Sequence, residues 1–274
     1  MVVMQFVSCL LPTMTKKQYR IYCADCLEKL AEIPENTFDM IFADPPYMLS
    51  NGGITCKNGC VVSVNKGDWD KSHGLSDDFE FHKRWICACH RVLKPNGTLW
   101  VSGTYHSIYS CGFAMQLLGF HILNDITWFK PNASPNMSCR YFTASHETLL
   151  WARKNKNAKH TFNYEAMKNG DFPKDFIKKP GRQMRSVWAI GTPTKEEKKF
   201  GKHPTQKPVE LLERIILAST KPSDLILDPF MGSGTTGVAA LKHGRLFVGI
   251  DKESQFVDLA KKRLYDISEK KDKK

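Results

Sequence analysis

The sequence has no apolar run long enough to cross a membrane. Its longest apolar stretches, for example residues 215–218 and 225–227, are far shorter than the roughly 18–20 residues that a membrane-spanning helix needs. The apolar opening, residues 1–14, has no basic segment before it and no small-residue cleavage site, and Lys16 and Lys17 follow it. We therefore expect neither a transmembrane helix nor a signal peptide.

The sequence also lacks the even, regularly spaced set of cysteines found in secreted disulfide-bonded domains. It has nine loosely spaced cysteines, none of them after Cys139, which favours a reducing cytoplasm. The pairs Cys23/Cys26 and Cys56/Cys60 could together form a four-cysteine zinc site. We instead expect buried or incidental thiols and no metal, because Cys23 ends an apparent strand and the second pair lies in a glycine-rich loop.

Acidic residues are too few to balance the basic ones. The chain has 40 Lys and Arg against 28 Asp and Glu, a formal net charge of +12, and between Arg153 and Lys207 the counts are 15 and 5. A concentrated basic segment indicates a polyanionic partner such as DNA, because each neutralised phosphate releases bound counterions. A solvated basic face explains the same excess, so charge alone leaves both interpretations open.

Short apolar runs recur along the chain with helical patterns between them. This alternation is typical of an α/β protein whose mostly parallel sheet is covered by helices on both faces. The runs that predict seven strands are residues 20–24, 38–43, 98–102, 122–129, 147–152, 225–227 and 246–250. Apolar residues that return every three or four positions predict helices over residues 79–92, 208–218 and 254–264. Pro208 fits the first turn of the second of these helices.

Residues 154–202 break this rhythm with scattered aromatics, prolines, glycines and many lysines. We interpret them as an inserted module that lies outside the sheet. The resulting division is a first part, 15–153, the insert, 154–202, and a second part, 203–266. The remaining residues, 267–274, form a charged tail that we expect to be frayed.

The first chemical signal is the tetrapeptide Asp44-Pro45-Pro46-Tyr47, directly after the apolar run 38–43. Ligand sites in open α/β sheets form at the carboxyl ends of parallel strands. An exocyclic base amine is a poor nucleophile because its lone pair is delocalised into the ring, so catalysis must orient it. The Asp44 carboxylate and the Pro45 carbonyl can each accept one N–H of such an amine. Pro46 stiffens the loop, and Tyr47 offers a stacking face for a base taken out of the helix. A rigid turn with a surface tyrosine is the alternative.

The second signal is the segment Asp-Pro-Phe-Met-Gly-Ser-Gly-Thr at residues 228–235, which also follows an apolar run. Its glycines permit a tight turn and a close approach of the backbone to a ligand at a helix start. Asp251 ends the next predicted strand, where it can bind ribose hydroxyls. Taken alone, this spacing equally fits a nicotinamide or flavin dinucleotide site. A methyl donor is favoured because a hydride carrier leaves Asp44 to Tyr47 without a role.

Together with His-Pro-Thr-Gln-Lys-Pro at residues 203–208, these motifs and their order resemble the beta-class amino-methyltransferases of restriction-modification systems. The likeness runs from about residue 20 to 264. It implies a permuted Rossmann-like, seven-stranded fold dependent on S-adenosyl-L-methionine (SAM), with an inserted target-recognition region. The second part of the chain would supply the first strands of the fold and bind SAM, and the first part would supply the catalytic strands.

The resemblance also implies roles for individual residues. Phe230, Gly232 and Gly234 would line the methionine end of the cofactor, Asp251 its ribose and Asp25 its adenine. A plain helix N-cap is the alternative for Asp25. The segment with Lys207 and Pro208 would close over the donor. The full set implied to bind the cofactor is Asp25, Lys207, Pro208, Asp228, Phe230, Gly232, Gly234, Thr235 and Asp251.

Four further segments, at residues 50–53, 66–70, 138–142 and 151–155, resemble the DpnA-type methyltransferases of systems that recognise GATC, some of which also act on single strands. Asn51 or Asp68 would lie near the target base, although loop capping explains both equally well. The residues expected to contact DNA are Asn51, Arg140, Tyr141, Lys178, Lys179 and Arg182.

The sequence therefore predicts a cytoplasmic, SAM-dependent DNA methyltransferase acting on adenine N6, with GATC as the expected site. A homodimer is possible. Asp instead of Ser at position 44 is a family tendency that favours adenine over cytosine N4, which remains the nearest alternative. A dinucleotide-dependent oxidoreductase and a noncatalytic nucleic-acid-binding protein are the alternatives from other classes.

Overall fold

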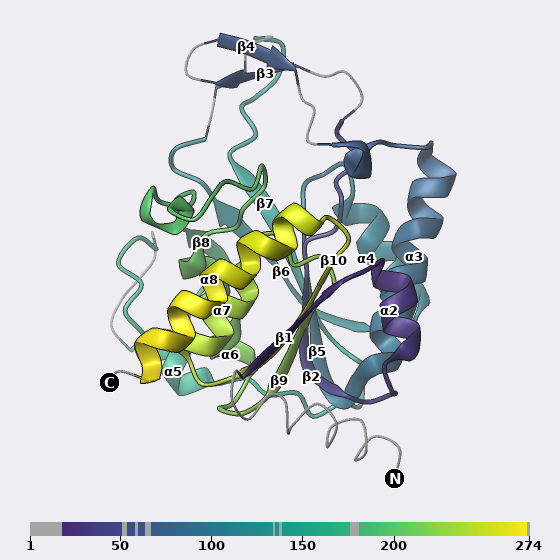
Figure 1. Ribbon diagram of the computed structural model, residues 1–274, viewed down its shortest axis with the longest axis vertical. Coiled ribbons are helices and arrows are strands. Elements are labelled where there is room, and N and C mark those ends of the chain that lie inside the picture. Colours follow the sequence, from purple (N-terminus) through teal and green to yellow (C-terminus); the bar gives the residue numbers. More distant parts are fainter. Residues whose placement is uncertain are drawn as a thin grey trace.

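The computed structural model describes residues 18–50, 54–57, 60–63, 67–133, 135–136, 139–175 and 181–272. Within them, eight strands form one sheet in the order β1-β10-β9-β2-β5-β7-β6-β8. Figure 1 shows this sheet between two layers of helices. The strands are β1 (Tyr19–Cys23), β2 (Phe38–Ala43), β5 (Leu93–Gly103), β6 (His121–Phe129), β7 (His146–Arg153), β8 (Val187–Ala189), β9 (Leu225–Asp228) and β10 (Leu246–Asp251).

The helices divide between the two faces of the sheet. The helices on one face are α2 (Cys26–Glu32), α3 (Leu75–Val92) and α4 (Ile108–Leu117). Those on the other face are α5 (Tyr164–Asn169), α6 (Val209–Ser219), α7 (Thr235–Lys242) and α8 (Ser254–Asp272). Because the sheet is covered on both sides, its central strands are mainly apolar, and β9 is buried at all four positions. Among the described residues, no helix is long and apolar enough to cross a membrane.

The sequence order of the strands is permuted relative to their order in the sheet. The C-terminal strands β9 and β10 lie in the sheet between the N-terminal strands β2 and β1, and all four run parallel. Strand β7 lies antiparallel between β5 and β6. The carboxyl ends of the neighbours β2 and β9 therefore meet at one edge, which brings together two loops that are about 180 residues apart in sequence.

All seven predicted strands are present, and the insert adds an eighth. The expectation that residues 154–202 lie wholly outside the sheet is wrong, because β8 pairs with β6 in parallel at the sheet edge. Trp188 and Ile190 are buried in the core, whereas Val187 is exposed. Three residues with one exposed make too short an apolar run to predict a strand from the sequence.

A buried ion pair fixes the insert to the rest of the domain. The Arg214 guanidinium on α6 donates to both carboxylate oxygens of Asp175, at 3.1 and 2.7 Å. Its plane also lies 4.2 Å from the ring centres of Phe172 and Trp188. Arg214 therefore joins the insert to α6 in two ways, by its ion pair with Asp175 and by its contacts with the two aromatic rings.

Three local features differ from the sequence-based expectations. Helix α6 begins at Val209, so that Pro208 is its N-cap residue and not part of its first turn. Helix α8 continues to Asp272, through most of the segment expected to be a frayed tail. The glycine-rich region after Tyr47 contains a separate antiparallel hairpin, β3 (Ile54–Lys57) with β4 (Cys60–Ser63), which projects from one end of the molecule in Figure 1.

Candidate active site

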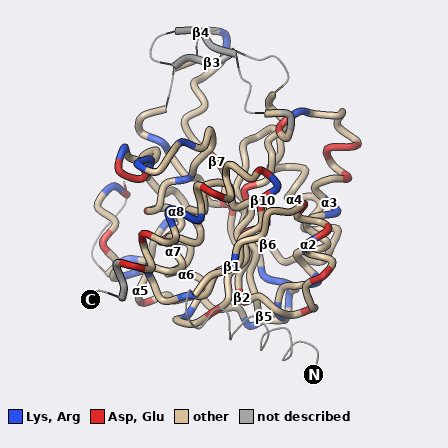
Figure 2. Tube along the Cα trace, viewed as in Figure 1, with Lys and Arg blue, Asp and Glu red and all other residues tan. Residues whose placement is uncertain are grey.

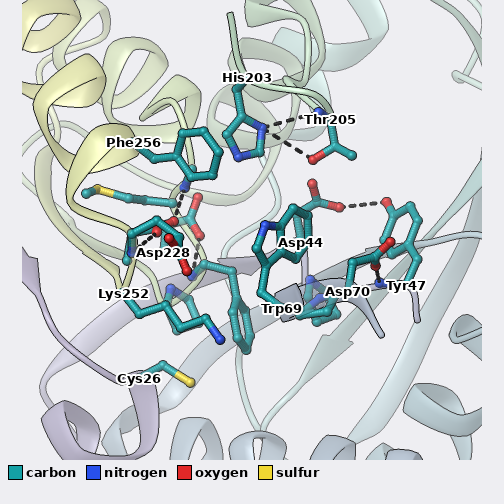
Figure 3. Close-up of a pocket in the computed structure, with 18 of the residues that line it drawn as sticks. Cys26, Asp44, Tyr47, Trp69, Asp70, His203, Thr205, Asp228, Lys252 and Phe256 are labelled. Atoms are coloured by element: carbon teal, nitrogen blue, oxygen red, sulfur yellow. Dashed lines mark hydrogen bonds between the residues drawn. The ribbon is translucent and has the colours of Figure 1, made fainter. Parts of the chain in front are cut away.

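The loops that follow β2 and β9 line one cavity of about 290 Å³ (Figure 3). The sequence-predicted residues that line it are Asp25, Asp44, Pro45, Pro46, Tyr47, Lys207, Asp228, Phe230, Gly232, Thr235 and Asp251. Pro208 and Gly234 are not among its lining residues. The two chemical signals of the sequence thus lie in a single site, as the parallel arrangement of β2 and β9 requires.

Asp44 is held at both oxygens of its carboxylate. The Tyr47 hydroxyl donates to Oδ1 at 2.6 Å, and the Lys207 ammonium donates to Oδ2 at 2.6 Å. Burial raises the pKa of Asp44 above its ordinary 3.8, although Lys207 acts to lower it. Each carboxylate oxygen has a further lone pair, so Asp44 can still accept a hydrogen bond from a ligand in the cavity.

Tyr47 lies in the network beside Asp44 and is only 5% exposed. Besides donating to Asp44, its hydroxyl lies 3.0 Å from Glu147 Oε2 and 3.2 Å from Ser102 Oγ. The Lys207 ammonium lies 5.2 Å from the ring centre. In this arrangement the ring is an internal support for Asp44. The expected stacking of a base on Tyr47 needs another orientation of the ring and stays a prediction.

The loop between β2 and α3 is fixed by Asp70, which the sequence reading did not single out. The Asp70 carboxylate accepts hydrogen bonds from Tyr47 N at 2.8 Å and from Ser50 Oγ at 3.0 Å. Asp70 is 1% exposed. The side chains of Asn51 and Asp68, which were expected near the target base, lie outside the described residues.

The glycine loop after β9 is bound to the end of β10. Gly232 N donates to Asp251 Oδ2 at 2.9 Å, and Glu253 N donates to Oδ1 at 2.9 Å. Gly232 has φ +48°, and a Cβ there would lie 3.0 Å from Nε2 of His203. The loop therefore needs glycine at this position, both for its backbone angle and for the close approach of His203.

Gly234 has a different role from Gly232. It is the N-cap of α7 with φ +74°, and a Cβ there would lie 2.9 Å from Cβ of Ala260 on α8. The residues on either side of it are held by buried Arg263, which donates to the Ser233 carbonyl at 2.7 Å and to the Thr235 hydroxyl at 2.9 Å. In this structure Gly234 serves the packing of α7 against α8.

Asp228 is the buried carboxylate at the start of the loop. Phe230 N donates to Oδ1 at 3.0 Å, and Thr236 Oγ1 donates to Oδ2 at 2.5 Å. Burial raises the pKa of Asp228 to about 7. The Phe230 ring packs edge-on against Trp85 of α3, with 5.4 Å between ring centres.

Asp25 has the capping role that was the alternative for it. As the N-cap of α2, its Oδ1 accepts from Leu27 N at 2.8 Å and from Glu28 N at 3.3 Å. It also lines the cavity. Capping holds the carboxylate in place at the cavity wall, so capping α2 is compatible with the predicted contact to the cofactor.

The cavity lining has more acidic than basic side chains, although the whole chain is basic. The acidic residues are Asp25, Asp44, Asp70, Asp77, Asp78, Asp228, Asp251 and Glu253, and the lysines are Lys71, Lys207 and Lys252. An acidic lining suits a cationic ligand and opposes the pyrophosphate of a dinucleotide. SAM carries a sulfonium and an ammonium, so its positive charges suit this lining.

Among the residues expected to contact DNA, the described ones, Arg140, Tyr141 and Arg182, do not line the cavity. Arg140 and Tyr141 are exposed on the connection between β6 and β7. Because Phe129 pairs with His146 and Thr148 with Gly103, this connection starts and ends at the same sheet edge as the cavity. Arg182 is exposed in the insert, and Lys178 and Lys179 lie outside the described residues.

The zinc hypothesis has no support among the side chains that the structure describes. They include no group of three or more His, Cys, Asp or Glu placed to hold a metal ion. Cys26 is buried and Cys23 is exposed, and the side chains of Cys56 and Cys60 lie outside this description.

The fold and the site together define a class, a group-transfer enzyme with a cationic donor and an amine acceptor. Comparison with known proteins makes this specific. Residues 38–262 match the family model described as DNA methylase, of the N6 and N4 type. The chain therefore belongs to the DNA methylase family, whose members transfer the methyl group of SAM.

Two relatives are similar over almost their whole length. The chain is 54% identical to type II methyltransferase M2.LlaDCHI of Lactococcus lactis subsp. cremoris, over 92% of this chain and 93% of the relative. It is also 54% identical to type II methyltransferase M2.DpnII of Streptococcus pneumoniae, over 92% of each. The solved M1.HpyAVI–SAM complex superposes with a TM-score of 0.64 at 30% identity, over 90% of this chain and 98% of that one. Family membership rules out the oxidoreductase alternative.

Proposed function

We propose that this protein methylates the exocyclic N6 of adenine in DNA, within GATC, as one methyltransferase of a type II restriction-modification system. One observation carries the reaction type. Asp44 and the glycine loop face the same acidic cavity, so that an amine acceptor and a cationic donor meet there. The relatives M2.LlaDCHI and M2.DpnII support the biological setting, because both are type II methyltransferases.

The protein residues orient the reacting amine. Asp44 accepts one N–H of N6 and the Pro45 carbonyl accepts the other, which directs the nitrogen lone pair toward the donor. Lys207 and Tyr47 hold the Asp44 carboxylate in place for this contact. SAM supplies an activated methyl group on a positively charged sulfur. With such a leaving group, transfer needs neither a metal ion nor a covalent enzyme intermediate.

Other residues bind the donor. Gly232 brings the backbone close to it, Asp251 binds the ribose hydroxyls, and Asp25 contacts the adenine. Phe230 forms an apolar wall, supported by Trp85. Asp228 and Thr235 fix the loop that surrounds the methionine portion. Lys207 was expected to act in a segment that closes over SAM, and its contact with Asp44 ties this segment to the catalytic tetrapeptide.

The test is methyl transfer from tritiated SAM into defined oligonucleotides, followed by analysis of the nucleosides. We expect N6-methyladenine in a duplex that contains GATC and none in a matched duplex in which GATC is changed to GTAC. N4-methylcytosine would establish the cytosine alternative. Methylated adenine at another sequence would refute GATC while leaving the adenine reaction intact.

Two finer expectations belong to this proposal. Activity on single-stranded DNA is expected from the likeness of residues 50–53, 66–70, 138–142 and 151–155 to DpnA-type methyltransferases. The same assay tests it with the isolated GATC strand, where transfer below one hundredth of the duplex rate would contradict it. Light scattering of the purified protein, with and without DNA, tests whether a homodimer forms.

A further inference from the structure

Four charged side chains and two hydroxyls form one buried cluster beneath the catalytic tetrapeptide. The charged groups are Asp44, Lys130, Glu147 and Lys207, and the hydroxyls are those of Tyr47 and Ser102. They come from five separate parts of the chain, including the ends of β5 and β6 and the start of β7. The cluster is therefore a product of the fold that no local motif contains.

Glu147 is at the centre of this cluster. Its Oε1 accepts from Lys130 at 2.5 Å, and its Oε2 lies 3.0 Å from the Tyr47 hydroxyl and 3.4 Å from Lys207 Nζ. Ser102 Oγ donates to the same Oε2 at 3.4 Å. Glu147 is 8% exposed. The two side chains that donate hydrogen bonds to Asp44, Tyr47 and Lys207, thus also contact Glu147.

The cluster is electrically balanced when its acidic and basic members are all ionised. Two carboxylates then face two ammonium groups, which limits the cost of burying them. Burial acts to raise the pKa of Glu147, but Lys207 and Lys130 lower it to about 2. Glu147 is therefore an anion at every pH at which the enzyme is expected to work, and it repels the neighbouring charge on Asp44.

We propose that Glu147 is a positioning residue for methyl transfer, which holds Lys207 and Tyr47 against Asp44 and, together with Lys130, sets the charge that surrounds Asp44. This inference rests on the proposed function of Asp44 as acceptor of the target amine. Glu147 does not line the cavity. It acts through Lys207 and Tyr47, and its removal changes the protonation of Asp44 without removing a contact to either ligand.

The charged and titratable groups that face Asp44 come from four segments of the chain. Tyr47 belongs to its own segment, Lys207 precedes α6, Glu147 begins β7, and Asp228 ends β9. Lys130 affects Asp44 through Glu147. A change at Glu147 or Lys130 therefore alters the net charge of the cluster in opposite directions while the other neighbours stay unchanged.

The experiment compares the pH dependence of kcat in Glu147→Gln, Lys130→Met and the double variant. Gln keeps an acceptor for Tyr47 and Ser102 but removes the negative charge, so ionisation of Asp44 becomes easier. We expect the acidic limb of the profile to move down by about one pH unit in this variant. Lys130→Met leaves excess negative charge and should move the limb up. The neutral pair in the double variant should return it close to the wild-type position.

Asp125→Asn is the matched control, because Asp125 is an exposed carboxylate on β6, next to β7. It should leave the profile unmoved. Carbon-13 NMR of aspartate-labelled protein, with Asp44→Asn to assign the signal, follows the ionisation of Asp44 directly and needs no turnover. A purely structural role for Glu147 predicts lower kcat at all pH values with an unmoved limb and an unmoved Asp44 titration, and that result would overturn the proposal.

Thermal unfolding separates misfolding from the proposed effect. If Glu147→Gln alone fails to fold, NMR of Lys130→Met still tests the upward shift, and NMR of the double variant tests whether loss of the Glu147 charge reverses it. A wild-type protein that transfers no methyl group to adenine would defeat the proposed function. In that case the NMR titration of Asp44 still decides whether Glu147 controls its charge.

Discussion

Asp44 illustrates how a single residue combines two demands. In the proposed reaction it is ionised and oriented to accept an amine N–H, yet burial opposes the ionisation of this carboxylate. Lys207 resolves the conflict by an ion pair at 2.6 Å, and the Tyr47 hydroxyl fixes the second oxygen. The orientation of the Asp44 carboxylate thus depends both on nearby Tyr47 and on Lys207, which is 163 residues away in sequence.

The first prediction concerns Asp44→Ala. Because Asp44 is proposed to contact the amine and not the donor, methyl transfer should fall by at least 10²- to 10³-fold, the order of magnitude for loss of one oriented polar group. SAM binding, measured by calorimetry, should survive. Asp125→Ala serves as control at an exposed carboxylate. Turnover near the wild-type rate in Asp44→Ala would remove Asp44 from the mechanism.

The second prediction concerns Gly232→Leu. The positive φ and the nearness of His203 leave no space for a side chain without displacing the loop. We expect the rise in melting temperature that SAM gives the wild-type protein to disappear. Gly119→Leu is the control, because Gly119 has φ +85° with open space around it and does not line the cavity. Tight SAM binding by Gly232→Leu would contradict the assigned role of the loop.

The third prediction is a pH dependence that arises from Asp228. Its pKa is about 7 in the folded protein, against an ordinary value of 3.8. Below pH 3.8 both states are protonated. Between 3.8 and 7 only the unfolded state loses the proton, so this residue lowers the free energy of unfolding as pH rises, by up to about 4 kcal/mol.

Asp228→Asn cannot lose a proton there. Its melting temperature, relative to wild type, should therefore increase between pH 5 and pH 8 in the absence of ligand. A difference between the two proteins that stays constant across this range would show that Asp228 is ionised throughout.

Some of the site residues were predictable from the sequence and others were not. Asp44, Asp228 and Asp251 stand directly after apolar runs, and the carboxyl ends of parallel strands are where ligand sites form, so these three positions were predictable. The contact between Lys207 and Asp44 depends on how two distant segments fold together. Glu147 had a weak signal, a carboxylate at the start of a run expected to be a buried strand, but only the three-dimensional neighbours give it a role.

At the scale of elements, the central parallel strands were predictable because strands buried on both faces are continuous apolar runs. The strand β8 was not, since its Trp188 is buried mainly by Arg214 and by neighbouring tryptophans and not by a local pattern. The hairpin β3–β4 was also missed, because its short strands lie in a segment rich in glycine and polar residues.

The fourth prediction follows from the anchor of the insert. The Asp175–Arg214 pair is buried, with side-chain exposures of 13% and 3%. Asp175→Ala leaves the guanidinium buried without its partner, and we expect a loss of about 3–5 kcal/mol in the free energy of unfolding. Lys174→Ala removes the neighbouring exposed pair with Glu210 and should cost less than about 1 kcal/mol. Urea denaturation measures both, and equal small losses would show that the pair does not hold the insert.

At the scale of the whole molecule, the distribution of charge separates two tasks. Acidic side chains outnumber basic ones in the cavity lining, although the chain carries a net charge of +12. Figure 2 shows Lys and Arg on several outer loops and helices, not on the insert alone. The acidic residues of the cavity suit a cationic cofactor. The basic residues on the outer surface suit the negatively charged DNA backbone.

Two surfaces are candidates for contact with the DNA backbone. The basic insert was expected to provide it through Lys178, Lys179 and Arg182. The connection between β6 and β7, with exposed Arg140 and Tyr141, lies at the same sheet edge as the cavity, which the target base must enter. The insert leaves β7 at Arg153, which pairs with Thr98 near the opposite end of the strands, and its strand β8 returns to the cavity end, where Ala189 pairs with Phe129.

The fifth prediction decides between these surfaces by the salt dependence of binding. Each phosphate contact that is lost reduces the slope of log K against log salt by about one. Replacing Lys178, Lys179 and Arg182 together by Gln should therefore weaken binding to all DNA sequences and flatten the slope by up to about three. Arg140→Gln is the matched change at the other surface. If the triple variant keeps the wild-type slope while Arg140→Gln lowers it, the connection between β6 and β7 carries the backbone contacts, and the insert must be assigned another role.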